Sequence, residues 1–498
     1  MTRNGLLQRT RDIKGSRVAL SDGEREITYA QLQPLVEAEI RWLHSGGKRI
    51  ALLADNGCSW ALTDLALHEA RIVNVPLPAY FTPQQLRHAV RDAGVDSIVT
   101  DRPDYALELW PELAVVGASK ITALTLLRRT VPDSRIALPA ATIKVTYTSG
   151  STAEPKGVCL SASALESVAH SLADIATSLG ISRHLCLLPL PTLLENLAGV
   201  YASLLAGATC ITPPASVTGM HYSALDAVKL LSTISRTQPE SLILVPELLR
   251  LLVHAASEGW SVPRSLKFIA VGGATVSPVL LEQAMALRLP VFQGYGLSEC
   301  ASVVCLNTPA ENRMGSVGKP LPHCQVRTDG HGQLHVRGAT MDGYLGGESP
   351  KYSDELATGD LGEIDADGFV YIKGRIRNII ITSVGRNISP EWVERELTQE
   401  SAIRHAIVLG EARPYPVALL FTSRADIEPA VIEQAVARAN SRLPDYARVV
   451  RWALLPEAPT LTNEMLTSNG RLRRERIIAR YPKLIDQLYE AKEMAGTP

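Results

Sequence analysis

Short apolar runs alternate with amphipathic segments along the first three hundred residues, and this alternation constrains the fold most strongly. It predicts strands at 50–54, 97–100, 242–245 and 268–271, and helices at 59–70 and 279–287. Strands that alternate with helices predict an α/β fold with largely parallel sheets, because helices serve as the crossovers between parallel strands. A single hydrophobic core stops growing near ~250–300 residues. A chain of 498 residues therefore needs more than one domain.

The pattern changes twice towards the C-terminus. From about residue 325, short strands are separated by glycine and aspartate turns, which predicts a small β-rich subdomain. After Arg375 the order strand, helix, strand, helix predicts a compact α+β domain, with elements at 379–381, 390–398, 406–409 and 427–443. We expect a large N-terminal nucleotide- and acyl-binding domain at 1–376. A small mobile α+β domain should follow at 377–498.

Charge and composition exclude several classes of protein. The formal net charge of -1, from 50 basic and 51 acidic residues, gives no electrostatic reason to expect a nucleic-acid partner. The seven scattered cysteines form no CxxC pair, which favours reduced, buried thiols in the cytoplasm. The N-terminus has no apolar core of a signal peptide, and prolines interrupt the most apolar stretch, 185–211. We expect a cytoplasmic protein without a transmembrane segment.

One segment has the composition of a phosphate-binding loop. Residues 146–157 read TYTSGSTAEPKG and follow a strand that begins near Ile143. Glycines let the backbone approach a ligand, hydroxyl and N–H groups can surround phosphate oxygens, and a lysine adds positive charge. It is not a Walker A loop, and a polar surface turn is the alternative interpretation. The predicted phosphate-binding residues are Thr148, Ser149, Gly150, Ser151, Thr152 and Lys156.

The order YTSGSTxxPKG resembles the nucleotide loop of adenylate-forming enzymes, which include acyl- and aryl-CoA synthetases, peptide-synthetase adenylation domains and beetle luciferases. Further motifs similar to that family follow in its order over roughly residues 20–490. They are GGA at 272–274, GYGLSE at 294–299, ATGDLGEIDADGFVYIKGR at 357–375 and LTSNGRLRRERI at 466–477. Residues 374–398 look most like the long-chain fatty acyl-CoA synthetase branch.

The resemblance implies a nucleotide site. Its adenine-contacting segment matches Gly272, Gly273 and Ala274, and its stacking tyrosine matches Tyr295, followed by Gly296. It also implies that Ser298 contacts the α-phosphate and that Glu299 holds Mg²⁺, an ion that prefers carboxylate and phosphate oxygens. Asp360 would bind the ribose hydroxyls, and Arg375 the ribose or a phosphate.

The resemblance also implies a moving C-terminal domain. The family's hinge position is Arg377, and the lysine that bridges the carboxylate and the nucleotide corresponds to Arg471. Arginine keeps the charge but differs from lysine in shape and hydration. Val384 stands where glycine is common, in a loop that the family uses near the thiol acceptor. The expected catalytic residues are Lys156, Glu299 and Arg471.

The acid and the acceptor are less constrained. Residues 187–197 read LLPLPTLLENL, with no aspartate to hold an ammonium group, which argues against amino acids. We expect Thr192, Leu193 and Gly294 to contact a fatty acid, with aryl acids as the main alternative. The expected cofactors are ATP, Mg²⁺ and CoA or phosphopantetheine. The predicted enzyme is an ATP-dependent acid–thiol ligase that uses CoA. The alternatives are a ligase that loads an acyl carrier protein and an impaired acyl-adenylate binding protein.

Overall fold

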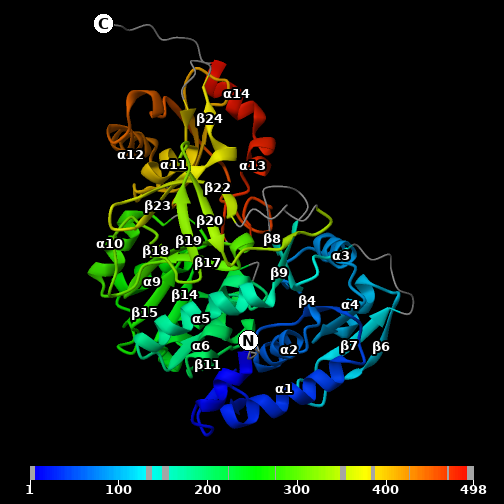
Figure 1. Ribbon diagram of the computed structural model, residues 1–498. Coiled ribbons are helices and arrows are strands. Elements are labelled where there is room, and N and C mark those ends of the chain that lie inside the picture. Colours follow the sequence, from blue (N-terminus) through cyan, green and yellow to red (C-terminus); the bar gives the residue numbers. More distant parts are fainter. Residues whose placement is uncertain are drawn as a thin grey trace, which may run out of the picture.

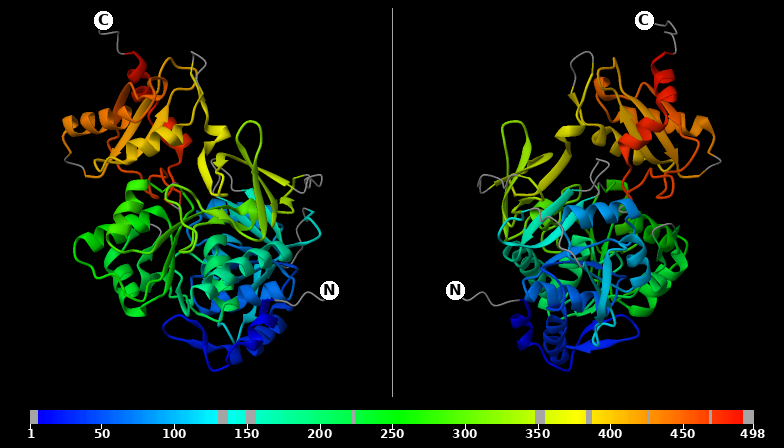
Figure 2. Two further views of the ribbon diagram at one scale, coloured as in Figure 1. Left: turned by 60° about the vertical axis from the view of Figure 1, so that its left-hand side comes forward. Right: turned by 90° about the vertical axis from the view of Figure 1, so that its right-hand side faces the viewer.

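The structure is a computed structural model that describes residues 6–129, 137–148, 156–221, 224–274, 276–347, 355–382, 387–424, 427–467 and 470–490. A large N-terminal part carries a smaller C-terminal domain at one end, and a small antiparallel sheet lies near their junction (Figures 1 and 2). The predicted fold class is confirmed.

One large sheet is parallel at its centre and antiparallel at both edges. The prediction of largely parallel sheets therefore holds for its central strands. In spatial order its strands are β18 (Lys319–Pro320), β17 (Ser302–Leu306), β16 (Val291–Leu297), β15 (Phe268–Val271), β14 (Ser241–Leu244), β10 (Arg183–Leu185), β11 (Thr209–Ile211), β1 (Val18–Ser21) and β2 (Glu26–Thr28).

The second large sheet has parallel pairs only among β8, β4, β3 and β5. Its edges are antiparallel, because β8 and β9 form a hairpin around the candidate phosphate loop and β5, β7 and β6 pair in alternating directions. Its strands are β21 (Gly343–Tyr344), β9 (Lys156–Ser161), β8 (Thr142–Thr148), β4 (Val73–Pro76), β3 (Arg49–Leu53), β5 (Ser97–Thr100), β7 (Thr125–Arg129) and β6 (Leu113–Ala118).

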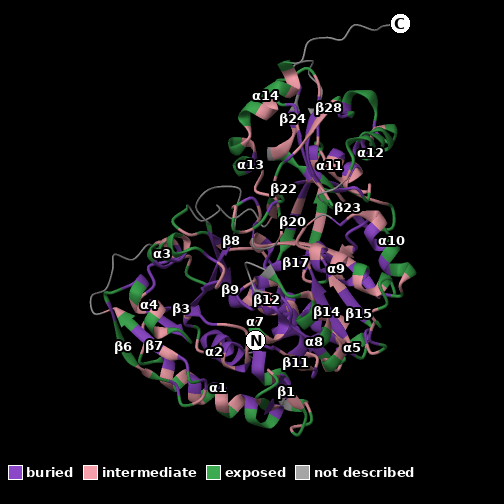
Figure 3. Ribbon diagram, turned by 180° about the vertical axis from the view of Figure 1, so that it is seen from behind, coloured by how far each residue is buried: buried purple, intermediate pink, exposed green. Residues whose placement is uncertain are grey.

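Helices form layers on both faces of these sheets. The largest core cluster joins residues of both sheets to α1 (Tyr29–Leu43), α2 (Cys58–Glu69) and α5 (Ala162–Ser178), so these helices share one core with the two sheets. On the other face of the first sheet, a second cluster packs α8 (Ala227–Thr237), α9 (Pro246–Ser257) and α10 (Pro278–Ala286). A third packs α3 (Pro83–Asp92) and α4 (Pro103–Leu109) against the second sheet. Figure 3 shows the strands β14 and β15 largely buried.

The small antiparallel sheet contains β19 (Cys324–Thr328), β20 (Gln333–Gly338), β22 (Glu355–Ile364) and β23 (Val370–Arg375). It corresponds to the predicted β-rich subdomain. The C-terminal domain contains β24 (Ile380–Ile381), β25 (Asn387–Ile388), α11 (Pro390–Thr398), β26 (Ile403–Leu409), β27 (Val417–Thr422), α12 (Pro429–Ser441), β28 (Arg451–Leu454), α13 (Arg474–Arg480) and α14 (Pro482–Glu490).

The apolar stretch 185–211 forms core elements, as predicted. It contains the π-helix η2 (Glu195–Tyr201), then α6 (Ala202–Leu205) and β11. In the part of the chain that the structure describes, none of the helices has the length and hydrophobicity of a membrane-spanning segment. All seven cysteines are buried and outside disulfides.

Candidate active site

A cleft of about 1920 Å³ is lined by the N-terminal part and by the C-terminal domain. Several of the predicted site residues lie on its wall although they are far apart in the sequence, among them Lys156, Tyr295, Glu299, Arg375 and Arg471. The folded chain therefore gathers these residues from four separate segments around one space.

The cluster of Tyr295, Asp360 and Arg375 lies where the small sheet meets the large one. Tyr295 is on β16, and Asp360 on β22 is the direct cross-strand partner of Arg375 on β23. The Tyr295 hydroxyl donates to Asp360 Oδ2 over 2.5 Å, and Arg375 Nε donates to Oδ1 over 2.7 Å. Burial and the Asp360 carboxylate raise the pKa of Tyr295, so the phenol stays protonated. Both carboxylate oxygens of a residue only 3% exposed are thus engaged.

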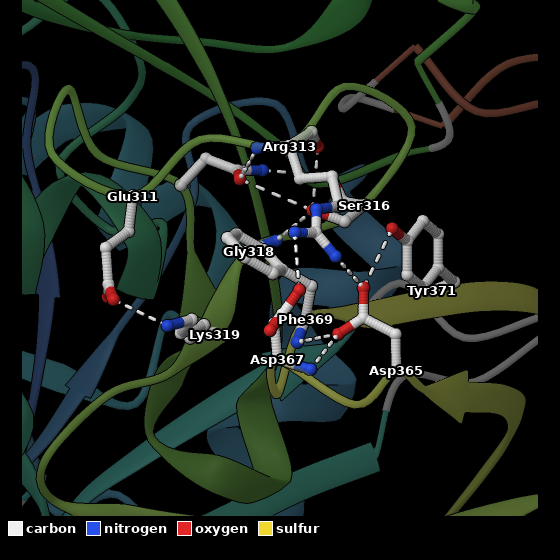
Figure 4. A network of polar contacts seen from close by, with 10 residues as sticks. Glu311, Arg313, Ser316, Gly318, Lys319, Asp365, Asp367, Phe369 and Tyr371 are labelled. Atoms are coloured by element: carbon white, nitrogen blue, oxygen red, sulfur yellow. Dashed lines mark hydrogen bonds and ion pairs between the residues drawn. The ribbon is translucent and has the colours of Figure 1, made fainter.

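A polar brace fixes the hairpin between β22 and β23 to the N-terminal part (Figure 4). Arg313 donates to Asp365 over 2.5 Å and to Asp367 over 2.8 Å, and its guanidinium lies 4.4 Å from the centroid of the Phe369 ring. The Tyr371 hydroxyl adds a bond to Asp365. Because β22 carries Asp360, this brace fixes the strand that presents the carboxylate.

The brace continues to the strand that carries Tyr295. The buried side chain of Asn307 donates to the carbonyls of Gln293 and Ser316, and its oxygen accepts from the backbone N–H of Arg313. Gln293 lies two residues before Tyr295 on β16. Tyr295 and Asp360 are therefore held in register from both sides. Sequence reasoning missed Asn307 and Arg313, which carry no motif of their own.

Different structural constraints explain the glycines in the predicted adenine segment and in the motif that contains Tyr295. Gly273 has φ +80°, a backbone conformation that residues with a side chain rarely adopt. A Cβ at Gly296 would lie 1.7 Å from the carbonyl oxygen of Ser302 on the adjacent strand, so the pairing of β16 with β17 alone requires glycine there. Gly272 and Gly294 line the cleft, and Ala274 follows Gly273.

Glu299 and Lys156 face the cleft from different sheets. Ser298 and Glu299 lie in a single turn, η3 (Ser298–Cys300), directly after β16, and Lys156 begins β9. The Tyr344 hydroxyl donates to Glu299 Oε1 over 2.8 Å. The backbone of Thr148 pairs with that of Lys156 at the end of β8. The side chain of Thr148, with Ser149, Gly150, Ser151 and Thr152, lies outside the described residues.

Arg471 reaches the cleft from the C-terminal domain. Its backbone N–H donates to the Thr467 hydroxyl over 3.0 Å, and its guanidinium donates to the carbonyl of Gly273. Reduced hydration in the cleft and repulsion by Arg375 lower the pKa of Arg471. The backbone of Arg377 lies in η4 (Ile376–Asn378), between β23 and the C-terminal domain, and its side chain is not among those described.

Ionic contacts near Arg471 join the two parts of the chain. Glu247 of α9 lies 3.2 Å from Arg404 and 3.7 Å from His405, both on β26. Burial lowers the pKa of His405 to about 4. The imidazole is therefore neutral near pH 7, and Arg404 supplies the positive partner of Glu247.

The wall of the cleft next to Gly294 is mostly apolar. Thr192 and Leu193 line it together with residues of α5 and its C-terminal cap, β10 and β15, which are Leu172, Ile175, Leu179, His184, Phe268 and Ala270. Glu195 stands behind this wall and braces its loop. Its Oε2 accepts from the backbone N–H of Leu188 over 3.0 Å, and its Oε1 lies 3.1 Å from His184 Nε2.

Lys144, on the strand before the phosphate loop, makes a buried ion pair and also a hydrogen bond to the π-helix behind this wall. Lys144 of β8 donates to Asp64 over 2.8 Å and to Asn196 of the π-helix over 2.5 Å. Burial lowers the pKa of Lys144, and the charge of Asp64 opposes that effect. No local sequence pattern indicates this contact.

Family models identify the class of protein. The AMP-binding enzyme model matches residues 7–345, and the model of the C-terminal domain of AMP-binding enzymes matches residues 377–493. The chain belongs to the AMP-binding enzyme family, and the predicted resemblance is confirmed.

Individual relatives are more distant. The chain is 27% identical to a 2-succinylbenzoate–CoA ligase of Bacillus cereus (strain ATCC 10987 / NRS 248), over 95% of this chain and 97% of the relative. It is 24% identical to the long-chain-fatty-acid–CoA ligase FadD15 of Mycobacterium bovis, over 89% and 88% of the two chains. The solved structure of the anthranilate CoA ligase AuaEII with anthranoyl-AMP has the same fold, with a TM-score of 0.78, 18% identity and 97% coverage of both chains.

Proposed function

We propose that this chain is an ATP-dependent acid–CoA ligase. In the first half-reaction a carboxylate oxygen attacks the α-phosphorus of ATP, an O–P bond forms, and the bond to pyrophosphate breaks. In the second, the sulfur of the CoA thiol attacks the acyl carbon, AMP leaves with the bonding electrons, and the thiol proton is released. One observation carries the proposal: Tyr295, Glu299, Lys156, Arg375 and Arg471 line one cleft, and Tyr295 and Arg375 both donate to the buried Asp360.

The cleft has the charges that the first half-reaction needs. A carboxylate and a triphosphate repel each other, so the site must neutralise charge and align the two groups. Lys156 and Arg471 supply positive charge from opposite parts of the fold. The acid is already ionised near neutral pH, and no general base is needed. Preorganised charge of this kind typically contributes about 3–4 kcal/mol per group to lowering a barrier.

The residues present fit Mg²⁺. This ion commonly binds through one or two carboxylates together with substrate phosphates and water. Glu299 offers a carboxylate to the same cleft as Lys156. Mg²⁺ would supply charge neutralisation at the triphosphate, and Glu299 would hold it. Asp360 would accept hydrogen bonds from the ribose, with Arg375 beside it.

We propose a fatty acid as the substrate. The wall formed by Leu172, Ile175, Leu179, Phe268 and Ala270 is apolar and suits an alkyl chain. Thr192 also lines the cleft, and its buried Oγ1 has no hydrogen-bond partner among the described residues. Similarity to the long-chain-fatty-acid–CoA ligase supports this choice.

An aryl acid is the second candidate. Several relatives at 27–28% identity are 2-succinylbenzoate–CoA ligases. The Phe268 and Phe292 rings stack 4.9 Å apart, and Phe268 lines the cleft, so an aromatic acid would also find a suitable wall. For the acceptor we propose CoA, because the relatives named above are CoA ligases. A carrier-protein phosphopantetheine is the alternative.

ATP–pyrophosphate exchange with a panel of acids tests the proposal. We expect exchange with fatty acids, or with benzoates and 2-succinylbenzoate if the second candidate is right, and none with amino acids. Supplying the acyl adenylate with CoA or with a holo-carrier protein then identifies the acceptor. Tight ATP binding without exchange on any acid would contradict the enzyme and favour an acyl-adenylate binding protein.

A further inference from the structure

Tyr344 lies on a short strand that connects two charged groups of the cleft. Its strand, β21, is antiparallel to β9, and Tyr344 pairs with Val158, two residues after Lys156. The backbone N–H groups of Asp342 and Leu345 donate to the carbonyls of Cys159 and Gly157 over 2.9 and 2.8 Å. The backbone around Tyr344 is therefore fixed to the strand that carries Lys156.

The same segment contacts both the backbone and the side chain of Glu299. The Met341 N–H donates to the Glu299 carbonyl over 2.7 Å, and the Tyr344 hydroxyl donates to Glu299 Oε1 over 2.8 Å. A carboxylate that accepts one fixed hydrogen bond has fewer side-chain orientations than a free one, and groups behind a metal ligand act in this way. The hydrogen bond from Tyr344 therefore also orients the other carboxylate oxygen of Glu299, and it does so whether or not a nucleotide is bound.

The ring of Tyr344 lies close to the positive charge of Lys156. Lys156 Nζ lies 5.8 Å from the ring centroid, within the range of a cation–π contact. Tyr344 is 37% exposed and lines the cleft, so packing in a core does not explain its position. One side chain thus contacts the proposed metal ligand through its hydroxyl and the proposed phosphate-binding lysine through its ring.

We propose that Tyr344 is a positioning residue of the metal–triphosphate site. Its hydroxyl orients Glu299 towards the divalent cation, and its ring restrains Lys156 near the triphosphate. The inference rests on the proposed function, since it assumes that Glu299 and Lys156 serve ATP. The two contacts are separable, because Tyr344→Phe removes only the hydroxyl and Tyr344→Leu also removes the ring.

The test uses binding without acid or turnover. Mn²⁺ replaces Mg²⁺, and electron paramagnetic resonance measures its affinity for the protein–ATP complex, while calorimetry measures ATP affinity without metal. Loss of a group behind a metal ligand typically costs about 10- to 100-fold in metal affinity. We expect Tyr344→Phe to weaken Mn²⁺ binding by about 10-fold and to leave metal-free ATP binding unchanged. Tyr344→Leu should weaken both.

Two controls separate positioning from general damage. Tyr481→Phe removes a hydroxyl that donates to Glu457 over 2.8 Å, a similar bond between two residues that do not line the cleft, and should change neither affinity. In a Glu299→Ala background, Tyr344→Phe should cause no further loss of Mn²⁺ affinity, because the hydroxyl acts through that carboxylate.

The outcomes distinguish this inference from the function on which it rests. If wild type binds Mn²⁺–ATP, Glu299→Ala weakens it and Tyr344→Phe does not, the role of Tyr344 is wrong and the proposed function stands. An equal loss from Tyr344→Phe with and without Glu299 would also overturn the inference. If wild type binds no ATP, both fail.

Discussion

Replacing Arg471 should affect the two half-reactions of the ligase unequally. The guanidinium of Arg471 crosses from the C-terminal domain to the carbonyl of Gly273, on the same cleft as Lys156 and Glu299. In this arrangement Arg471 can reach a nucleotide and an acid at the N-terminal wall. From the resemblance to the family we expect the thiol step to use a rotated C-terminal domain, with Arg471 then outside the cleft.

The expected size follows from the charge that is lost. Two opposite unit charges about 4 Å apart interact by ~4 kcal/mol at an effective dielectric constant of about 20. Each ~1.4 kcal/mol is a factor of ten in rate. Arg471→Ala should therefore slow acyl-adenylate formation by roughly 10³-fold. Arg471→Lys keeps the charge and should lose about tenfold or less, for lack of the planar fork.

Single-turnover assays measure the steps separately. Adenylate formation is followed by pyrophosphate release, and the thiol step by adding CoA to supplied acyl adenylate. We expect Arg471→Ala to retain most of the thiol step. Equal losses in both half-reactions would refute the assigned role, as would an unchanged rate of pyrophosphate release.

Three further predictions concern the surroundings of the site. Arg313→Ala should raise the KM for ATP about two- to fivefold with kcat unchanged, because a partly exposed ion pair contributes ~1 kcal/mol or less; Arg327→Ala, which breaks the Arg327–Glu355 pair on the same small sheet, is the matched control. Since the folded pKa of His405, about 4, lies below its unfolded value, the unfolded chain binds more protons between about pH 6.5 and 4. Stability should fall by up to ~3 kcal/mol as the pH drops through that window, and His405→Gln should flatten the urea-unfolding profile; an equal slope in the variant contradicts this. Ala270→Phe narrows the cleft at its apolar wall, and the ratio of pyrophosphate exchange with shorter acids to that with longer acids should rise by about tenfold. An unchanged preference for acid length would place the acid elsewhere.

Local patterns predicted the elements well. The predicted strand 268–271 and helix 390–398 coincide with β15 and α11. The first is a short apolar run and the second an amphipathic helix, and both have clear boundaries in the sequence. The proline-interrupted apolar stretch 185–211 predicts core elements, and the structure has them there. Its π-helix, η2, has a period that such patterns do not reveal.

The candidate site was predicted only where a motif carried it. Tyr295, Asp360 and Arg375 were named from the resemblance, and the structure brings them into direct contact. Tyr344 and Glu247 were missed, because their contacts with Glu299 and Arg404 join residues far apart in the sequence. Gly296 shows the converse, since strand pairing explains a glycine that the motif assigned to the ligand.

A crystal structure with ATP, Mg²⁺ and a non-reactive analogue of the acid tests the central claim most directly. The account predicts the ribose on Asp360, the adenine beside Tyr295, and the triphosphate between Lys156 and the cation on Glu299. A nucleotide bound away from these side chains would contradict the proposed ligase.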